Sequence, residues 1–280
     1  MNRNDLRQQF DDQGYVKLKG FLDSNVVAQA RSAMEELVEQ RAQQLVAAGK
    51  IASPMRAEPF ETRFFRLYEE HLDDAPKSFR RELHLSGLFD LFFNPALLDV
   101  VEVFIGPEVR LYPNYTARPK FPDWKGTEVL WHQDGGYTEQ VAEDVGSVEL
   151  QRMVNVWTPL VPARAANGCM QFVPGTHKLG AVPHESREYY LEIARESLDP
   201  YVESAVDVEL DPGDVVLFQN LLFHRGQPNL SKEIRWSFDW RYQDARQPTL
   251  RKEEGHIARS RSNPDSAVKS AAEWASLTFR

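Results

Sequence analysis

The chain has almost no cysteine and no long apolar run. Its 280 residues include a single cysteine, Cys169, which has no partner for an intramolecular disulfide and therefore favours a reducing compartment. No stretch approaches the roughly 18 apolar residues that a membrane-spanning helix needs. Neither end of the chain resembles a signal peptide or a peroxisomal address. These absences predict a soluble, cytoplasmic protein without a membrane partner.

Clusters of basic residues and phosphate-binding glycine loops are absent too. Acidic side chains outnumber basic ones by 42 to 33, which gives a formal charge of −9. Such a balance repels phosphate backbones, so nucleic acid is a poor candidate partner. No glycine-rich loop of the dinucleotide-binding or P-loop type follows a predicted strand. The sequence leaves a homo-oligomer open.

The residues that are present divide the chain into a helical first part and a strand-rich second part. One helix is predicted after Asp23 and another from Pro95, with Asn94 as its N-cap. From Val109 onward, short segments rich in β-branched and aromatic residues predict strands. We expect an α+β chain of one domain built on a β-sandwich, jelly roll or barrel. Its parts are a helical region at about 1–108, a strand core at about 109–245 and an extension at about 246–280.

Two His-x-Asp triplets, at His71 and at His132, are candidates for a metal site. The segment around His71 predicts an exposed helix, on which residues i and i+2 project about 200° apart and cannot grip one ion. The run EVLWHQD predicts a strand that stops at two glycines, and on a strand residues i and i+2 share a face. His132 and Asp134 are therefore the candidate pair of ligands.

A third ligand is expected from His224, which follows the apolar run DVVLFQNLLF and opens a turn at a predicted barrel mouth. Two imidazoles and one carboxylate form the facial triad of non-haem Fe(II) oxygenases, and the same set can hold a hydrolytic zinc. Arg235 favours iron, because a neighbouring strand would present its guanidinium to the carboxylate of a 2-oxo acid. The alternative is a surface arginine paired with Glu233 or Asp239. Solvated or structural roles are expected for the remaining histidines, which are His84, His177, His184 and His256.

Several longer segments, taken together and in order, carry a family resemblance. They are GYVKLKGFL, NPALLDVVEVFIGPEVRLY, WHQDGGY, VNVWTPLV, ANGCMQFVPGTHK, LDPGDVVLFQN and HRGQPNLSKEIR. The chain resembles the phytanoyl-CoA dioxygenase family of Fe(II)/2-oxoglutarate-dependent oxygenases over most of its length. The most specific features are ANGCMQFVPGTHK and the eleven-residue interval between His224 and Arg235.

The resemblance implies a double-stranded β-helix (jelly roll, cupin-like) core flanked by N-terminal helices. It implies Fe(II) at His132, Asp134 and His224, with 2-oxoglutarate and O₂ as co-substrates. It also implies roles beside the 2-oxo acid or the substrate for Arg235, Trp157, Asn114 and Arg118. One position departs from the family pattern: Gly226 stands where the family often has a serine or threonine that assists the arginine.

Asp134 also indicates the type of reaction, because related halogenases have a small residue in its place. The resemblance therefore implies hydroxylation, or a desaturation, ring closure or ketone formation, with release of CO₂ and succinate. Candidate substrate-lining groups are Tyr137, Phe121, Trp124 and the polar excursion 176–206, which is either a lid or a surface connection. We expect a small natural product or metabolite, amine- or hydroxyl-rich rather than a CoA thioester. A zinc hydrolase and a non-catalytic jelly-roll binding protein remain as alternatives.

Overall fold

The computed structural model describes residues 2–139, 150–187 and 191–279. Its helices are α1 (Arg3–Gln13), α2 (Ser24–Ala47), α3 (Phe60–Arg66), α4 (Phe89–Phe92), α5 (Pro95–Ile105), α6 (Asp134–Glu139), α7 (Arg195–Leu198) and α8 (Ala271–Ser276). Its strands are β1 (Tyr15–Leu18), β2 (Glu108–Lys120), β3 (Val129–His132), β4 (Met153–Pro159), β5 (Met170–Phe172), β6 (His184–Ser186), β7 (Leu191–Ile193), β8 (Val206–Val208), β9 (Val215–Gln219), β10 (His224–Gly226), β11 (Arg235–Asp244) and β12 (His256–Ser260).

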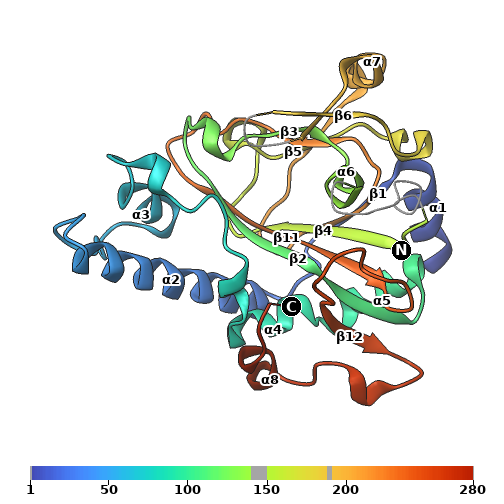
Figure 1. The fold of residues 1–280 in the computed structure, drawn as a ribbon, viewed down its shortest axis with the longest axis horizontal. Coiled ribbons are helices and arrows are strands. Elements are labelled where there is room, and N and C mark those ends of the chain that lie inside the picture. Colours follow the sequence, from blue (N-terminus) through green and yellow to red (C-terminus); the bar gives the residue numbers. More distant parts are fainter. Residues whose placement is uncertain (1, 140–149, 188–190, 280) are drawn as a thin grey trace.

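Two antiparallel sheets form the centre of the molecule. The larger sheet has the strand order β1-β9-β4-β11-β2-β12, and the smaller has the order β3-β10-β5-β8. Figure 1 shows the smaller sheet above the larger one, with α2, α4 and α5 beneath. This is the predicted jelly roll with helices on one side. None of the helices in the described ranges is long and apolar enough to cross a membrane.

The outer face of the larger sheet carries the main apolar core. Along β11 the side chains of Trp236, Phe238, Trp240 and Tyr242 alternate with polar residues, and all four are buried against the helical layer. Successive side chains of a strand point to opposite faces, so these aromatic residues commit one face of β11 to packing. Burial of aromatic and aliphatic side chains is the main source of stability for such a layer.

The inner face of β11 is turned toward the smaller sheet and is polar. It carries Arg235, Ser237, Asp239, Arg241 and Gln243 between the aromatic residues of the other face. All but Asp239 are buried. Buried polar side chains need partners or ligands, so the space between the two sheets is where the chemistry is expected.

Most predicted elements are confirmed, and one is wrong. Helices α2 and α5 begin where expected, and the Asn94 side chain accepts a hydrogen bond from Leu97 N at 3.1 Å. His71 is exposed as expected, but the helix predicted around it is not formed. The segment contains only a short 3-10 turn at Leu72–Asp74. Pro76 disfavours helical backbone in the residue before it, which leaves too short a segment for a regular helix.

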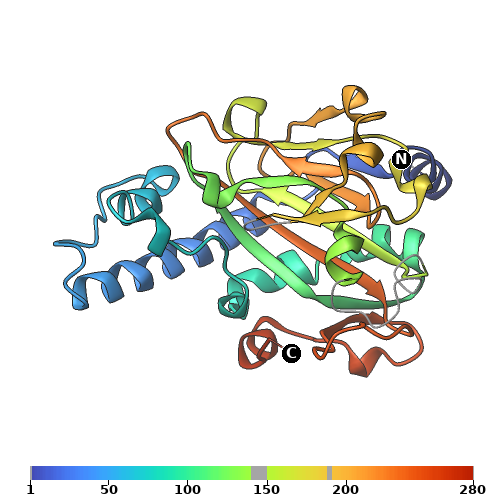
Figure 2. The same ribbon diagram turned by 45° about the horizontal axis from the view of Figure 1, so that its top comes forward.

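Two regions are more structured than their composition suggests. The excursion 176–206 contains the hairpin β6–β7 and helix α7 within its described residues. At the C-terminal end, β12 adds to the edge of the larger sheet beside β2, and Trp274 of α8 is fully buried in the main core. These C-terminal residues appear red, below the larger sheet, in Figure 2. The predicted extension is therefore part of the packed core.

Candidate metal centre

The three candidate ligands predicted from the sequence come together between the two sheets. His132 is the last residue of β3, Asp134 begins α6, and His224 begins β10, which pairs with β3. One ligand atom of each residue lies within 4.8 Å of the others. The Asp134 carboxylate is 3.6 Å from His132 Nε2 and 3.8 Å from His224 Nε2. This donor set fits a divalent metal ion and leaves coordination positions open for co-substrates.

Backbone carbonyls orient both imidazoles for a metal. His132 Nδ1 lies 2.8 Å from Leu130 O, and His224 Nδ1 lies 2.8 Å from Leu222 O. Because a carbonyl oxygen only accepts, Nδ1 is the protonated nitrogen in each ring and Nε2 keeps its lone pair toward the site. Burial, followed by the neighbouring His132, lowers the pKa of His224 to about 3. His224 is therefore neutral at physiological pH, as a metal ligand must be.

Arg241, on the inner face of β11, keeps Asp134 ionised. Its Nη2 donates to Asp134 Oδ1 at 2.6 Å. Burial alone would raise the pKa of Asp134, but the charge of Arg241 opposes burial, and that pKa lies well below its usual value. An ionised carboxylate and two neutral imidazoles are the protonation states that bind a metal.

The geometry corrects two details of the sequence-based interpretation. Asp134 does not share a strand with His132: the strand ends at His132, and Asp134 starts a helix. The chain turns there, and Gly135 N donates to Asn220 O at 3.0 Å. His224 does not sit at an open mouth either. It is 2% exposed, with its ring 4.8 Å from that of Phe218.

His184 supports the turn between the candidate ligands His132 and Asp134, a contact that its sequence context did not indicate. Its Nε2 accepts a hydrogen bond from the backbone N of Gln133, the residue between the two N-terminal ligands, at 3.0 Å. Its Nδ1 lies 2.8 Å from Val182 O. A Cβ at Gly136 would lie only 2.8 Å from His184 Cε1, so the turn and the ring are closely packed. Burial lowers the pKa of His184 to about 4, which keeps the ring a neutral acceptor.

Arg235 lies deep between the sheets, as the resemblance implies, and is 4% exposed. Its Nε donates to Gly168 O at 3.2 Å, its Nη1 donates to Ser237 Oγ, and its guanidinium faces the Trp157 ring at 5.3 Å. The expected alternative, a surface ion pair with Glu233 or Asp239, is not what the described residues form. A buried guanidinium held by neutral groups fits an incoming carboxylate.

Ser237 gives Arg235 a hydroxyl partner within its own strand. It lies two residues after Arg235 on the same face of β11, and the two side chains are hydrogen-bonded. Alternate residues of a strand share a face, so following this alternation along the sequence from Arg235 places Ser237 and Arg241 on the same face as Arg235. The contact of His184 with Gln133 joins parts of the chain 51 residues apart and has no sequence signal.

Unsatisfied polar atoms on the inner face complete the case for a bound ligand. Asn114 Oδ1 and Thr116 Oγ1 on β2, and both amide atoms of Asn155 on β4, are buried without a hydrogen-bond partner. Arg118, also on β2, pairs with Asp239 at 2.6 Å. Buried polar groups without partners are rare and mark places where a ligand or water binds.

The three aromatic residues predicted to line a substrate pocket lie in two different places. The Tyr137 ring is 5.3 Å from that of His132, beside the metal centre, and its hydroxyl accepts from Leu191 N at 3.1 Å. Phe121 is instead 1% exposed within the outer aromatic core, and Trp124 packs beside it. This placement favours a packing role for Phe121 and Trp124, because the end of β2 turns them toward α3.

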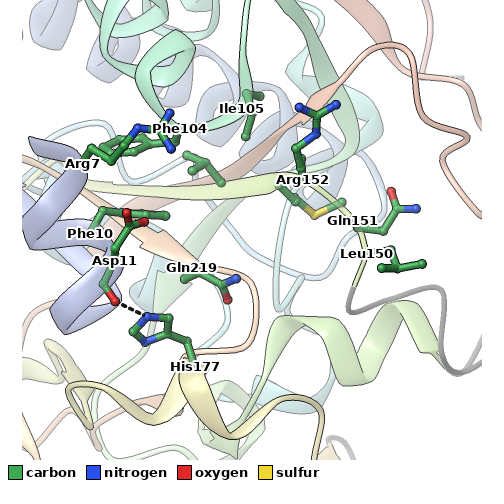
Figure 3. A pocket seen from close by; sticks show the side chains of 12 residues that line it. Arg7, Phe10, Asp11, Phe104, Ile105, Leu150, Gln151, Arg152, His177 and Gln219 are labelled. Carbon is green, nitrogen blue, oxygen red and sulfur yellow. Dashed lines mark hydrogen bonds between the residues drawn. The ribbon is translucent and has the colours of Figure 1, made fainter. Parts of the chain in front are cut away.

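A separate pocket of about 400 Å³ lies between α1, α5 and the start of β4. Figure 3 shows His177 on one side of it, with its Nε2 3.0 Å from Asp11 O, and Arg7 and Arg152 on the other. None of the three candidate metal ligands lines this pocket, and neither does Arg235. It is therefore distinct from the metal centre.

The fold and the triad define an Fe(II)- and 2-oxoglutarate-dependent oxygenase. The profile of the phytanoyl-CoA dioxygenase family matches residues 10–237, and the chain belongs to that family. It is 30% identical to a 1-deoxypentalenic acid 11-beta-hydroxylase of Streptomyces arenae, over 87% of this chain and 82% of the relative. It is 27% identical to the human peroxisomal phytanoyl-CoA dioxygenase, over 50% of this chain and 41% of the relative.

Two solved structures show the same fold. EctD from S. alaskensis, solved with 2-oxoglutarate and 5-hydroxyectoine, superposes with a TM-score of 0.63 at 21% identity, over 96% of this chain and 85% of that one. The carbocyclase SnoK from nogalamycin biosynthesis gives a TM-score of 0.55 at 22% identity, over 88% of this chain and 85% of that one.

Proposed function

We propose that this enzyme hydroxylates a small natural product or metabolite, with 2-oxoglutarate as the electron-donating co-substrate. His132, Asp134 and His224 would hold Fe(II), and Arg235 would bind the distal carboxylate of 2-oxoglutarate. The observation that carries the proposal is the pairing of a His-Asp-His triad with a buried arginine that has no carboxylate partner among the described residues. The reducing cytoplasm suggested by the lone Cys169 suits an Fe(II) enzyme.

Each protein group has a definite task in this function. Iron held by His132, Asp134 and His224 would supply the activation of O₂ for the oxidation of co-substrate and substrate. Leu130 O and Leu222 O fix the imidazoles, and Arg241 holds the carboxylate of Asp134 in its ionised state. Trp157 provides a flat wall beside the Arg235 guanidinium. Such preorganised groups orient the reactants without rearrangement during the reaction.

The groups on the substrate side favour an acidic substrate, whereas the sequence led us to expect an amine- or hydroxyl-rich one. Arg80 follows Phe79, which bridges Ala117 of β2, and the charged neighbours of Arg80 include the inner-face residue Arg241. Arg80 donates no side-chain hydrogen bond within the described ranges, and Arg118 and Asp239 are among its charged neighbours. Burial, followed by the charge of Arg118, lowers the pKa of Arg80 to about 10, so it remains a cation at neutral pH.

An acidic group on the substrate would complement these arginines. The named substrate of the Streptomyces relative is also an acid. The test is a screen of small carboxylic acids, each paired with its methyl ester and with an amine of similar size, scored by succinate formation. We expect at least tenfold faster turnover of the acid in the best pair. Preference for the ester or the amine would contradict the acidic substrate and leave the oxygenase assignment intact.

The oxygenase itself is tested more directly, without knowing the substrate. Under anaerobic conditions, addition of Fe(II) and 2-oxoglutarate should produce a weak visible charge-transfer band. A zinc hydrolase or a silent binding protein would give no band. Arg235→Ala should lose the band at a 2-oxoglutarate concentration that saturates the wild type.

A further inference from the structure

A second buried cation, Lys120, lies beside Arg235. Lys120 is the last residue of β2 and the register partner of Arg235, the first residue of β11. The two residues are 3% and 4% exposed. Their side chains converge on Gly168: Arg235 Nε donates to Gly168 O, and a Cβ at Gly168 would lie 2.7 Å from Lys120 Cδ and Cε.

Among the described residues, the hydrogen-bond partners of Lys120 Nζ are neutral. Its Nζ donates to Thr127 O at 3.0 Å and to Gly226 O at 3.2 Å. No carboxylate of the described residues lies within ion-pair distance of Nζ, and Arg235 likewise has only Gly168 O and Ser237 Oγ. Two adjacent cations removed from water without a counterion are costly to a fold unless an anion binds between them.

The charges farther away do not balance this pair. Burial, followed by the charge of Arg235, lowers the pKa of Lys120 well below its usual value. Arg118 and Arg225 act in the same direction, and Glu128 opposes them. A dicarboxylate that enters beside Arg235 would supply the missing negative charge.

Gly226 explains why there is room for the lysine. The family resemblance puts a serine or threonine at this position, with its hydroxyl toward the arginine. Here a Cβ on Gly226 would already lie 3.3 Å from Lys120 Nζ. The Nζ of Lys120 therefore lies against the position that a side chain at residue 226 would take, and Gly226 leaves room for it.

We propose that Lys120 is a second anchor for the distal carboxylate of 2-oxoglutarate and acts together with Arg235 in the place of the hydroxyl that Gly226 lacks. The inference rests on the proposed function, because it assumes that Arg235 binds this carboxylate. The expected effect is on the selectivity of the co-substrate site. Lys120 and Arg235 together should favour 2-oxoglutarate, a five-carbon dicarboxylate, over a 2-oxo acid with a neutral tail.

The test compares two ligands that differ only at the distal end. Dissociation constants are measured by calorimetry for 2-oxoglutarate and for 2-oxopentanoate, which has a methyl group in place of the distal carboxylate, on protein loaded with redox-inert Ni(II). In Lys120→Met we expect the constant for 2-oxoglutarate to rise about 10- to 100-fold. The constant for 2-oxopentanoate should change less than threefold. Lys125→Met, which removes a nearby exposed charge, should leave both constants unchanged.

A purely structural lysine would behave differently. If Lys120 only ties Thr127 to Gly226, Lys120→Met would lower the unfolding temperature and change both constants in the same proportion, and this result would overturn the proposal. Lys120→Gln provides a second test in case Lys120→Met folds poorly. The glutamine amide still donates to a carbonyl but carries no charge. It should show the same selective loss of 2-oxoglutarate affinity, and wild-type selectivity in Lys120→Gln would equally overturn the proposal.

Arg235→Ala separates the two levels of inference. If the wild type binds 2-oxoglutarate and Arg235→Ala does not, while both Lys120 variants keep wild-type selectivity, only the role of Lys120 fails. If the wild type itself shows no preference for 2-oxoglutarate over 2-oxopentanoate, the proposed function fails with it.

Discussion

The two faces of β11 differ in chemistry far more than in burial. Trp236, Phe238, Trp240 and Tyr242 on one face are at most 1% exposed and pack against the helices. Arg235 and Arg241 on the other face are 4% and 5% exposed, yet Arg235 contacts Gly168 O and Arg241 contacts the candidate ligand Asp134. A single strand thus commits alternate residues to the apolar core and to the polar space of the candidate site.

The comparison of the two faces shows that burial alone does not distinguish residues of the apolar core from residues of the candidate site. Aromatic side chains on the outer face satisfy one another by packing, as Phe64, Phe79 and Trp236 do with ring centroids 5.5 to 6.2 Å apart. Polar side chains on the inner face are satisfied only in part, as Asn155 shows. A shift of β11 by one residue would exchange the two sets, so the register of this strand is fixed by both requirements. The predictions below run from the largest expected effect on turnover to the smallest.

Replacement of His224 by alanine should abolish turnover, because it removes one of the three candidate ligands. Since the ring also contacts Phe218, some loss of stability is expected as well, unlike for a ligand at an open mouth. The measurements are Fe(II) affinity, succinate formation and thermal unfolding. His71→Ala is the matched control, because its ring is exposed and should affect none of the three. Wild-type Fe(II) affinity in His224→Ala would remove His224 from the site.

Asp134→Gly should nearly eliminate hydroxylation. The metal would lose its anionic ligand and Arg241 would lose its 2.6 Å partner, so Fe(II) affinity should fall. The family resemblance associates a small residue at this position with chlorination. Even so, we expect chlorinated product only in traces, since a halogenase also needs a chloride pocket. Product masses with and without chloride test this, and unchanged hydroxylation would show that Asp134 is not a ligand.

Arg235→Ala should raise the apparent KM for 2-oxoglutarate about 30- to 1,000-fold, which corresponds to a loss of about 2–4 kcal/mol of binding. Arg235→Lys should recover only part of this, because an ammonium cannot reproduce the guanidinium fork. Initial rates at varied 2-oxoglutarate concentration are sufficient. A KM equal to that of the wild type in Arg235→Ala would favour the zinc alternative.

The sequence could predict the residues of the centre but not all of its supports. Strand patterns and the resemblance identified the triad, and the deep burial of Arg235 agrees with its expected role. The support of Gln133 by His184 depends on a contact between distant segments, which no local pattern encodes. The sequence places Phe121 among the candidate substrate-lining residues, but aromatic residues line both substrate pockets and apolar cores. Only the path of the chain after β2, which puts Phe121 in the outer core, decides between the two positions.

Neighbouring residues of β11 offer the sharpest test of the two-face comparison. Phe238→Ala removes a fully buried ring from the outer core and should lower the free energy of unfolding by about 3–5 kcal/mol, with the KM for 2-oxoglutarate unchanged. Ser237→Ala removes only the hydroxyl that meets Arg235, so it should raise this KM about 2- to 10-fold with less than about 1 kcal/mol of destabilisation. Urea unfolding gives the free energy of unfolding of each variant, and initial rates give the KM of each variant for 2-oxoglutarate. If Phe238→Ala raised the KM while Ser237→Ala left it unchanged, the division of labour between the two faces would be wrong.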